Sequence, residues 1–199
     1  MTIREKMKNG LLYTDMGEGL DEERRDCKEL LFDYNNTRPS QEIERKRLLK
    51  KLLGSCGENI WIEPNLRMAY GKNTYIGENF YANFNLVVVD DIDVYIGDNV
   101  MIAPNVTITA TGHPVDPNLR KGGAQFSVPV RIGNDVWIGA NVVILPGITI
   151  GDNSVIGAGS IVTKDIPANV VAVGNPCKVL REINERDKEY YYKNRKVSE

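Results

Sequence analysis

The sequence is poor in the residues that build metal centres and disulfide frameworks. It has one histidine and three cysteines among 199 residues. The cysteines, Cys27, Cys56 and Cys177, lack metal-ligand spacing, and an odd, sparse set argues against paired disulfides. We therefore expect a protein of the reducing cytoplasm that requires no metal. A catalytic thiol is also disfavoured, because it would need a base nearby and the chain has a single histidine.

A strong excess of one charge and a long apolar run are also missing. The chain has 25 basic and 27 acidic residues, a net charge of −2, so nucleic acid and anionic membranes are not expected partners. No apolar stretch approaches the ~20 residues of a spanning helix. The opening MTIREKMKNG lacks the apolar core of a signal peptide. With 42 % hydrophobic and 26 % charged residues, the composition is that of a soluble globular protein.

The first 57 residues are expected to be helical. One helix is predicted over residues 21–34, where charged residues surround a few apolar ones, and residues 35–39 (NNTRP) break it. Ser40 is the expected N-cap of a second helix that runs through Leu52. Gly54 is its expected C-terminal cap.

From about residue 60 the apolar residues follow a period of six. An α-helix would need spacings of three and four, and an ordinary strand would alternate by two. Glycine recurs after isoleucine, which indicates a corner that needs positive φ or close approach of the backbone. The series are Ile76, Ala82, Val88; Ile96, Ile102, Ile108; and Ile132, Ile138, Ile144, Ile150, Ile156, Val162, with Ile-Gly pairs at 76–77, 96–97, 132–133, 138–139, 150–151 and 156–157.

A short strand and a corner repeated every six residues are typical of a parallel β-helix, whose stacked coils bury the aliphatic position. Ordinary hairpins would not keep one phase over thirty residues. We predict a mainly β fold with a helical segment (1–57), a β-helix (58–180) and a tail (181–199). The period breaks between Ile108 and Ile132, which predicts an inserted loop at about 109–130. This loop holds His113, and an insertion in a regular solenoid is a common place for function.

Six segments carry a more specific signal: LYTDM at 12–16, GENFYANFN at 77–85, IAPNVT at 102–107, TGHP at 111–114, VWIG at 136–139 and GAGSIVTKDIP at 157–167. Together they resemble the galactoside and maltose O-acetyltransferases, a family of hexapeptide-repeat acyltransferases. The resemblance covers nearly the whole chain. It implies a left-handed β-helix with three strands per coil, an exception to the right-handed crossover rule.

The resemblance also implies a base, an oxyanion donor and a sugar pocket. His113 would be the general base, because the imidazole pKa of ~6.5 lies near working pH. The backbone N–H of Ala140 would bind the oxyanion, a role that does not depend on the side chain. The sugar would be bound by Asp15, Tyr81, Asn83 and Asp91. A helix cap, a solenoid corner and a turn are the alternative roles for Asp15, Asn83 and Asp91, respectively.

Acetyl-CoA is the implied co-substrate. Trp137 would flank the pantetheine arm, and cations would meet the phosphates. Lys178 stands where an arginine is common, which keeps a point charge but loses a bidentate contact. Surface charge is the alternative role for Lys164 and Arg181. The implied CoA-binding residues are Trp137, Ala140, Ala158, Thr163, Lys164, Lys178 and Arg181.

We therefore expect an acetyl-CoA-dependent O-acetyltransferase that acts by direct attack on the 6-hydroxyl of a galactoside, glucoside or maltose-type sugar. The resemblance implies a homotrimer with active sites between subunits. Ala69 stands where the galactoside enzymes have a serine, which predicts relaxed acceptor choice.

Other functions fit the sequence less well. A different hydroxylated acceptor is the first alternative. A non-enzymatic solenoid scaffold would leave the TGHP loop unexplained. A γ-type carbonic anhydrase, built on the same solenoid, would need three histidines for its zinc. A serine acetyltransferase would bring a longer helical domain, in which the segment around Asp15 would be out of place.

Overall fold

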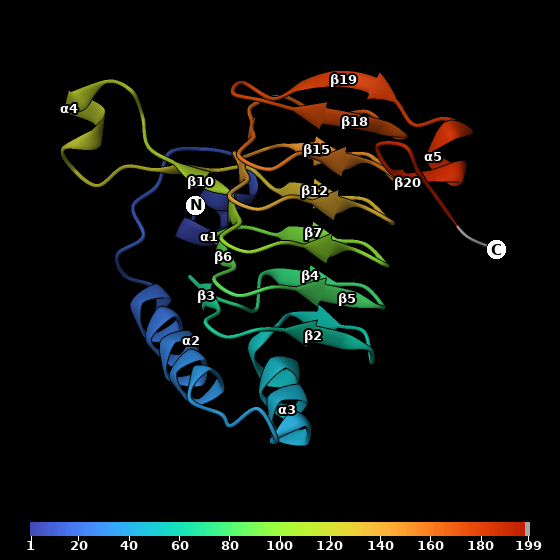
Figure 1. Ribbon diagram of the computed structural model, residues 1–199. Coiled ribbons are helices and arrows are strands. Elements are labelled where there is room, and N and C mark those ends of the chain that lie inside the picture. Colours follow the sequence, from blue (N-terminus) through green and yellow to red (C-terminus); the bar gives the residue numbers. More distant parts are fainter. Residues whose placement is uncertain (198–199) are drawn as a thin grey trace.

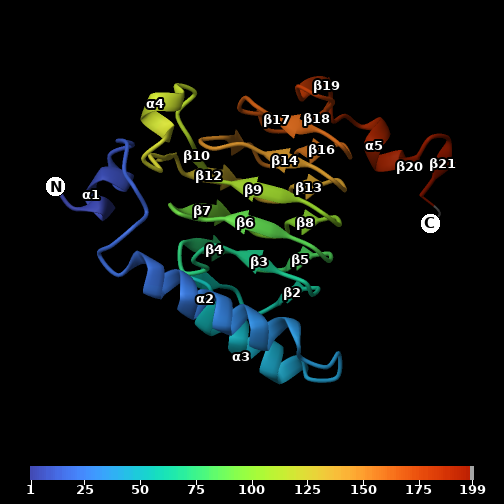
Figure 2. The ribbon, with the colours of Figure 1, turned by 90° about the vertical axis from the view of Figure 1, so that its left-hand side faces the viewer.

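Three parallel β-sheets wrap around one interior, and each coil of the chain adds a strand to every sheet (Figures 1 and 2). The computed structural model describes residues 1–197. The first sheet contains β1 (Ser55–Cys56), β4 (Thr74–Ile76), β7 (Val94–Ile96), β12 (Val130–Ile132) and β15 (Thr149–Ile150). The second contains β2 (Ile60–Ile62), β5 (Phe80–Ala82), β8 (Met101–Ile102), β13 (Trp137–Ile138), β16 (Val155–Ile156), β18 (Val170–Val173) and β19 (Lys178–Glu182). The third contains β3 (Arg67–Met68), β6 (Val87–Val89), β9 (Thr107–Thr109), β14 (Val143–Ile144) and β17 (Ile161–Val162).

The residues of the six-residue period fill the interior. All twelve are buried, and the most exposed of them, Ile76, is 5 % exposed. They stack in register: Ile76 pairs with Ile96, Ile96 with Ile132, and Ile132 with Ile150. The predicted parallel solenoid of hexapeptide repeats is therefore confirmed.

The glycines that follow isoleucine are places of close approach, not of positive φ. A Cβ added at Gly77 would lie 2.2 Å from Asp98 Oδ1. The positive φ angles fall two residues later, as at Asn79 and Asn99, since asparagine tolerates the left-handed region. These side chains also bond from coil to coil, with Asn79 Nδ2 donating to Asn99 Oδ1 at 2.9 Å.

Every departure from the six-residue period falls at the third corner, where the chain passes from the third sheet to the first. At the other two corners, successive interior residues are always six apart. At the third corner, the last interior residue of one coil and the first of the next are residues 68 and 76, 88 and 96, 108 and 132, 144 and 150, and 162 and 166. Of these five intervals, only that from 144 to 150 keeps the period of six. The longest interval contains the inserted loop, with β10 (Thr111–Gly112), α4 (Pro117–Arg120) and β11 (Phe126–Ser127).

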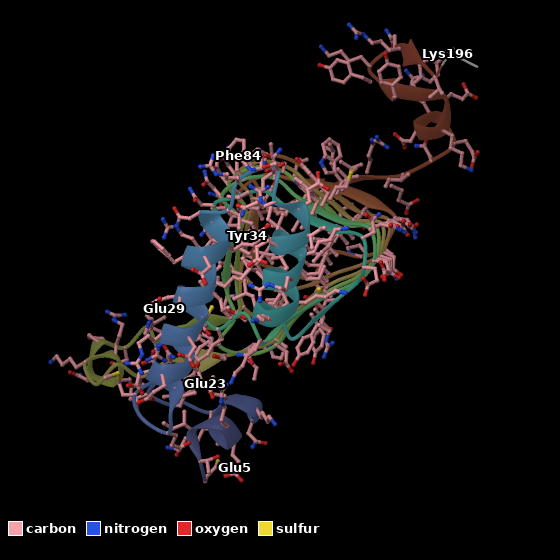
Figure 3. The ribbon with its side chains drawn as sticks, turned by 90° about the horizontal axis from the view of Figure 1, so that it is seen from below. Glu5, Glu23, Glu29, Tyr34, Phe84 and Lys196 are labelled. Atoms are coloured by element: carbon pink, nitrogen blue, oxygen red, sulfur yellow. The ribbon has the colours of Figure 1, made fainter. Side chains whose placement is uncertain are left out.

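Helices close the base of the solenoid. They are α2 (Leu20–Asn35) and α3 (Glu42–Leu52), and Figures 1 and 3 show them across the open end of the first coils. The short helix α1 (Ile3–Lys8) lies instead at the side of the solenoid, against β11 of the inserted loop. Asn35 anchors α2, because its side chain donates to Leu66 O at 2.9 Å and accepts from Leu66 N at 2.8 Å. The predicted Ser40 cap is wrong: α3 begins at Glu42 with Gln41 as N-cap.

At the other end, the antiparallel pairing of β18 and β19 covers the last coil. Beyond it, α5 (Arg186–Glu189) leads into a hairpin of β20 (Tyr190–Tyr192) and β21 (Arg195–Lys196), which projects from the solenoid (Figure 3). Within residues 1–197 no helix is both long and apolar enough to cross a membrane. The segment boundaries at 57 and 180 stay predictions.

The corner glycines predict a stability effect. A Cβ at Gly151 would lie 2.4 Å from Ala168 N and 2.9 Å from Pro167 C, and backbone atoms cannot move aside as a flexible side chain can. We expect Gly151→Ala to lower the free energy of unfolding by roughly 1–3 kcal/mol, as overpacking does. Thermal unfolding measures this. Gly122→Ala is the control, since nothing lies within 4 Å of its added Cβ; equal stability of the two variants would contradict the prediction.

Candidate active site

The inserted loop presents His113 at the third corner. β10 and β11 pair antiparallel and form the neck of the loop, with Thr111 opposite Ser127. His113 follows β10 directly and is exposed. Its Nδ1 lies 2.9 Å from Ala124 O on the returning strand of the loop. A carbonyl oxygen can only accept, so Nδ1 carries a proton, and in the neutral ring Nε2 then has a free lone pair.

The N-terminal arm, residues 9–19, runs alongside this loop. Tyr13 N donates to Gln125 O at 3.0 Å, and Gln125 N donates to Tyr13 O at 2.8 Å. The Tyr13 hydroxyl lies 2.5 Å from Ser127 Oγ, which is 2.8 Å from Thr111 Oγ1. This pairing carries Asp15, two residues further on, to the same corner as His113.

Asp91 supplies a second carboxylate at this corner. It is 6 % exposed, and Gln125 Nε2 donates to its Oδ1 at 3.2 Å. Burial is the main cause of its raised pKa; the negative charge of Asp15 acts in the same direction, and the positive charge of Arg24 opposes it. Arg24 also pairs with Asp15, at 3.1 Å between Nη1 and Oδ2, and donates to the Tyr70 hydroxyl at 2.7 Å. Asp15, Asp91 and His113 thus share one polar corner.

A second group of predicted residues lies at a different corner. Asn83 and Ala140 lie on the second corner, between the second and third sheets, and Tyr81 and Trp137 lie on the adjoining strands β5 and β13. Tyr81 is 37 % exposed and Trp137 is 53 % exposed. The Asn83 carboxamide oxygen accepts from Phe84 N at 2.8 Å. Among the described residues, the Ala140 N–H donates no hydrogen bond, so it is available to a ligand.

The predicted CoA-binding residues continue from this group toward the last coil. Trp137 lies in register with Val155, Val155 with Val171, and Val171 with Arg181. Ala158 lies at the second corner and Lys178 begins β19, whereas Thr163 and Lys164 lie at the third corner of the last coil; all four are exposed. Arg181 differs from the expectation of a free cation. Its guanidinium is paired with Asp187 at 2.6 and 2.7 Å.

One chain therefore holds the predicted site in two separate parts. Figure 3 shows Phe84, which marks the second corner, at the opposite end of the cross-section from α1 and α4. The predicted base and the two carboxylate residues lie at the third corner. The predicted oxyanion donor and Asn83 lie at the second, with Tyr81 and Trp137 on the adjoining strands. In the described part of the chain, no group of three His, Cys, Asp or Glu side chains could hold a metal ion.

The chain also matches known proteins over its whole length. A galactoside O-acetyltransferase of Escherichia coli (strain K12) is 59 % identical over 197 residues, which are 99 % of this chain and 97 % of the relative. The chain belongs to the galactoside O-acetyltransferase family. Residues 6–57 match the maltose acetyltransferase hexapeptide capping motif, and residues 129–164 match the bacterial transferase hexapeptide of six repeats.

Other members of the family agree. A galactoside O-acetyltransferase of Lactococcus lactis subsp. lactis (strain IL1403) is 48 % identical, with 94 % of this chain and 90 % of the relative covered. A galactoside acetyltransferase solved in complex with coenzyme A superposes with a TM-score of 0.99 at 58 % identity and full coverage of both chains. A maltose O-acetyltransferase from Clostridium difficile 630 gives 0.91 at 51 % identity, covering 93 % of this chain and 99 % of that one. The family assignment made from the sequence is confirmed.

Three residues of the corner were missed by the sequence analysis. Arg24 lies on a helix rich in charge, where a solvated face is the ordinary expectation. Tyr13 stands within the LYTDM segment, and only its position beside Asp15 marks it. Gln125 lies in the irregular inserted loop, where the sequence gives no periodic signal. The roles of the residues that were predicted stay proposals.

Asp90 is a buried carboxylate that supports the corner. Its Oδ1 accepts from Tyr70 N at 2.9 Å and from Ala69 N at 3.1 Å, and its Oδ2 accepts from Thr74 Oγ1 at 3.0 Å. Burial raises its pKa from 3.8 to about 6, against the effect of these hydrogen bonds. The folded protein therefore holds this proton more tightly than the unfolded chain does. The resulting stability is fully present below pH 3.8 and is lost as the pH rises through about 6.

We predict that Asp90→Asn removes the loss of stability that Asp90 causes as the pH rises. In the wild type, Asp90 should lower the free energy of unfolding by roughly 3 kcal/mol between about pH 4 and 7, at about 1.4 kcal/mol per pKa unit. An asparagine titrates nowhere in this range and can keep the oxygen acceptor. Denaturant unfolding at several pH values measures the slope, with exposed Asp98→Asn as control. An Asp90→Asn slope equal to that of the wild type would show that this carboxyl does not titrate in the window.

Proposed function

We propose that this chain transfers the acetyl group of acetyl-CoA to the 6-hydroxyl of a galactoside, glucoside or maltose-type sugar, with His113 as general base. The observation that carries the mechanism is the Nδ1 hydrogen bond to Ala124 O. It leaves Nε2 as the lone pair that accepts a proton from a hydroxyl. The names of the relatives support the substrates, since they include galactoside and maltose enzymes and a complex with coenzyme A.

The reaction follows from this geometry as a direct transfer. His113 Nε2 takes the proton of the sugar hydroxyl while the oxygen attacks the thioester carbonyl. The negative charge that develops on the carbonyl oxygen is stabilised by the N–H of Ala140, a contribution of about 3 kcal/mol to the barrier. The intermediate collapses, the C–S bond breaks, and the imidazolium returns its proton to the thiolate of CoA. No acyl-enzyme is needed, because within residues 1–197 no nucleophilic side chain is hydrogen-bonded to His113.

The polar third corner supports a sugar as acceptor. Asp15 and Asp91 present carboxylate oxygens beside His113, and carboxylates accept hydrogen bonds from sugar hydroxyls. Asn83 and Tyr81 would close the pocket from the second corner. Ala69 offers no hydroxyl, so we expect little discrimination between galactosides and glucosides.

The CoA molecule would lie along the second sheet toward the last coil. Trp137 would flank the pantetheine arm, beside Ala140 and Ala158, and Lys178 would meet phosphates from β19. Thr163 and Lys164 would do so from the third corner of the last coil. Arg181 is already neutralised by Asp187. We therefore assign it a weaker part in phosphate binding than the two lysines.

The two separated parts of the site would meet in a homotrimer. The outward row of the second sheet carries exposed apolar side chains, including Met101, which is 52 % exposed, and Trp137. Soluble oligomers are mostly closed and symmetric. In a three-fold arrangement, the third corner of one copy would face the second corner of the next, so His113 would face Asn83 and Ala140 of a neighbour. We place the enzyme in the cytoplasm, where its three free cysteines stay reduced.

We predict that His113→Ala lowers the turnover of acetyl transfer by ~10²–10⁴, as loss of a general base does, while CoA affinity changes only a few-fold. Acetyl transfer from acetyl-CoA to a panel of galactosides, glucosides and maltose measures this. An acetylated enzyme intermediate or full activity of the variant would overturn the mechanism. No transfer by the wild type to any sugar would favour another hydroxylated acceptor.

A shared site predicts complementation between two inactive variants. His113→Ala lacks the base, and Asn83→Ala lacks a residue of the facing corner. If subunits mix at random in a symmetric trimer, about a quarter of the seams pair an intact His113 with an intact Asn83. Refolding the two variants together at equal amounts should restore about that fraction of wild-type activity. Activity no higher than that of either variant alone would place both residues in one subunit's site.

A further inference from the structure

His113 depends for its orientation on a single peptide group. Among the described residues its imidazole makes one hydrogen bond, to Ala124 O. The loop between His113 and Ala124 is mostly exposed, and added Cβ atoms at Gly122 and Gly123 would meet nothing within 4 Å. The loop alone therefore does little to hold the Ala124 carbonyl in place.

The N-terminal arm holds the other side of that same peptide. The carbonyl of Ala124 and the N–H of Gln125 belong to one planar amide, in which they point in opposite directions. Gln125 N donates to Tyr13 O at 2.8 Å, while Ala124 O accepts from His113 at 2.9 Å. Tyr13 and His113 are thus hydrogen-bonded to opposite sides of one rigid peptide group. Donation by the N–H also makes the carbonyl a stronger acceptor, as in other chains of hydrogen bonds.

Tyr13 is itself fixed. It is 3 % exposed, and its N–H donates to Gln125 O at 3.0 Å. Its hydroxyl lies 2.5 Å from Ser127 Oγ in the neck of the loop. Gln125 is held a second time through its side chain, at 3.2 Å from Asp91 Oδ1. The chain from Tyr13 to His113 therefore ends in buried, hydrogen-bonded residues.

We propose that Tyr13 is a positioning residue, whose carbonyl fixes the Ala124–Gln125 peptide and thereby holds His113 in the Nδ1–H tautomer. The neutral histidine side chain in water favours the opposite tautomer, with the proton on Nε2, and this leaves Nε2 no lone pair to accept the proton of a hydroxyl. The N-terminal arm is then part of the catalytic apparatus although it reaches the base only through a peptide. The link to catalysis rests on the proposed function; the link to the tautomer does not.

The single histidine makes a direct test possible. The ¹⁵N chemical shifts of the imidazole, recorded at about pH 8, report the tautomer and need no resonance assignment. Gln125→Pro deletes the N–H that donates to Tyr13 O, together with the side-chain contact to Asp91. Gln125→Ala also deletes the side-chain contact but keeps the N–H. We expect Gln125→Pro to shift His113 toward the Nε2–H form and to lower kcat about tenfold or more relative to Gln125→Ala, with the KM for acetyl-CoA unchanged. Gln125→Ala should keep the wild-type tautomer.

A second pair of variants covers the case in which Gln125→Pro does not fold. Tyr13→Ala should shift the tautomer, because loss of the buried ring releases the arm and with it the Tyr13 carbonyl. Tyr13→Phe retains the buried ring and the backbone bonds, so it should keep the wild-type tautomer. Tyr34→Ala is the control for lost stability, since Tyr34 is equally buried, at 1 % exposed, and its hydroxyl donates to Ile62 O. A wild-type tautomer in both Gln125→Pro and Tyr13→Ala would overturn the proposal. A shifted tautomer in a protein that acetylates no sugar would support the clamp and refute the proposed function.

Discussion

The constraint on which the rest of the structure depends is the stacking of each coil on the one before it. Each interior isoleucine or valine lies on its counterpart one coil away, and the strands bond at that spacing throughout all three sheets. Adding or removing one residue within a strand would turn its apolar side chains outward. The chain can therefore change length only at a corner. The first corner is fixed as well, because its glycines leave no room for a Cβ. At the first and second corners, asparagines bond from coil to coil.

The third corner is the place where this constraint is relaxed. Two added residues bring the pair Asp90 and Asp91 into the turn, and the long insertion in the next coil places the loop directly above them. Buried carboxylates are costly unless they accept hydrogen bonds. Asp90 accepts three, and Asp91 accepts one from Gln125 of the inserted loop. Desolvation and hydrogen bonding thus tie the irregular parts of the chain to one another, and they gather the polar chemistry at one edge of an otherwise apolar prism.

The parts of the structure that repeat could be predicted from the sequence, and the parts that do not repeat could not. The six-residue period gave the strands, the buried residues and the place of the insertion, because the interior imposes one rule on every coil. The pairing of Tyr13 with Gln125 leaves no such trace, since it joins residues 112 positions apart through backbone atoms that every residue possesses. The ion pair between Arg181 and Asp187 lies after the last repeat, where no periodic pattern marks it. Sequence alone indicated that glycine was needed at the corners, but not that close approach was the cause.

The candidate residues are divided between two corners, and at the third corner the N-terminal arm and the inserted loop alone hold His113. Among the described residues no carboxylate is hydrogen-bonded to His113, and its one hydrogen bond is to the backbone carbonyl of Ala124. That carbonyl is made rigid from behind by the arm that also carries Asp15. With His113 as the proposed base, one segment would perform two tasks: it would line the acceptor side of the corner and orient the imidazole. If a neighbouring copy supplies the oxyanion donor, the arm makes the His113 half of the site rigid before the subunits meet, so assembly does not have to order the base.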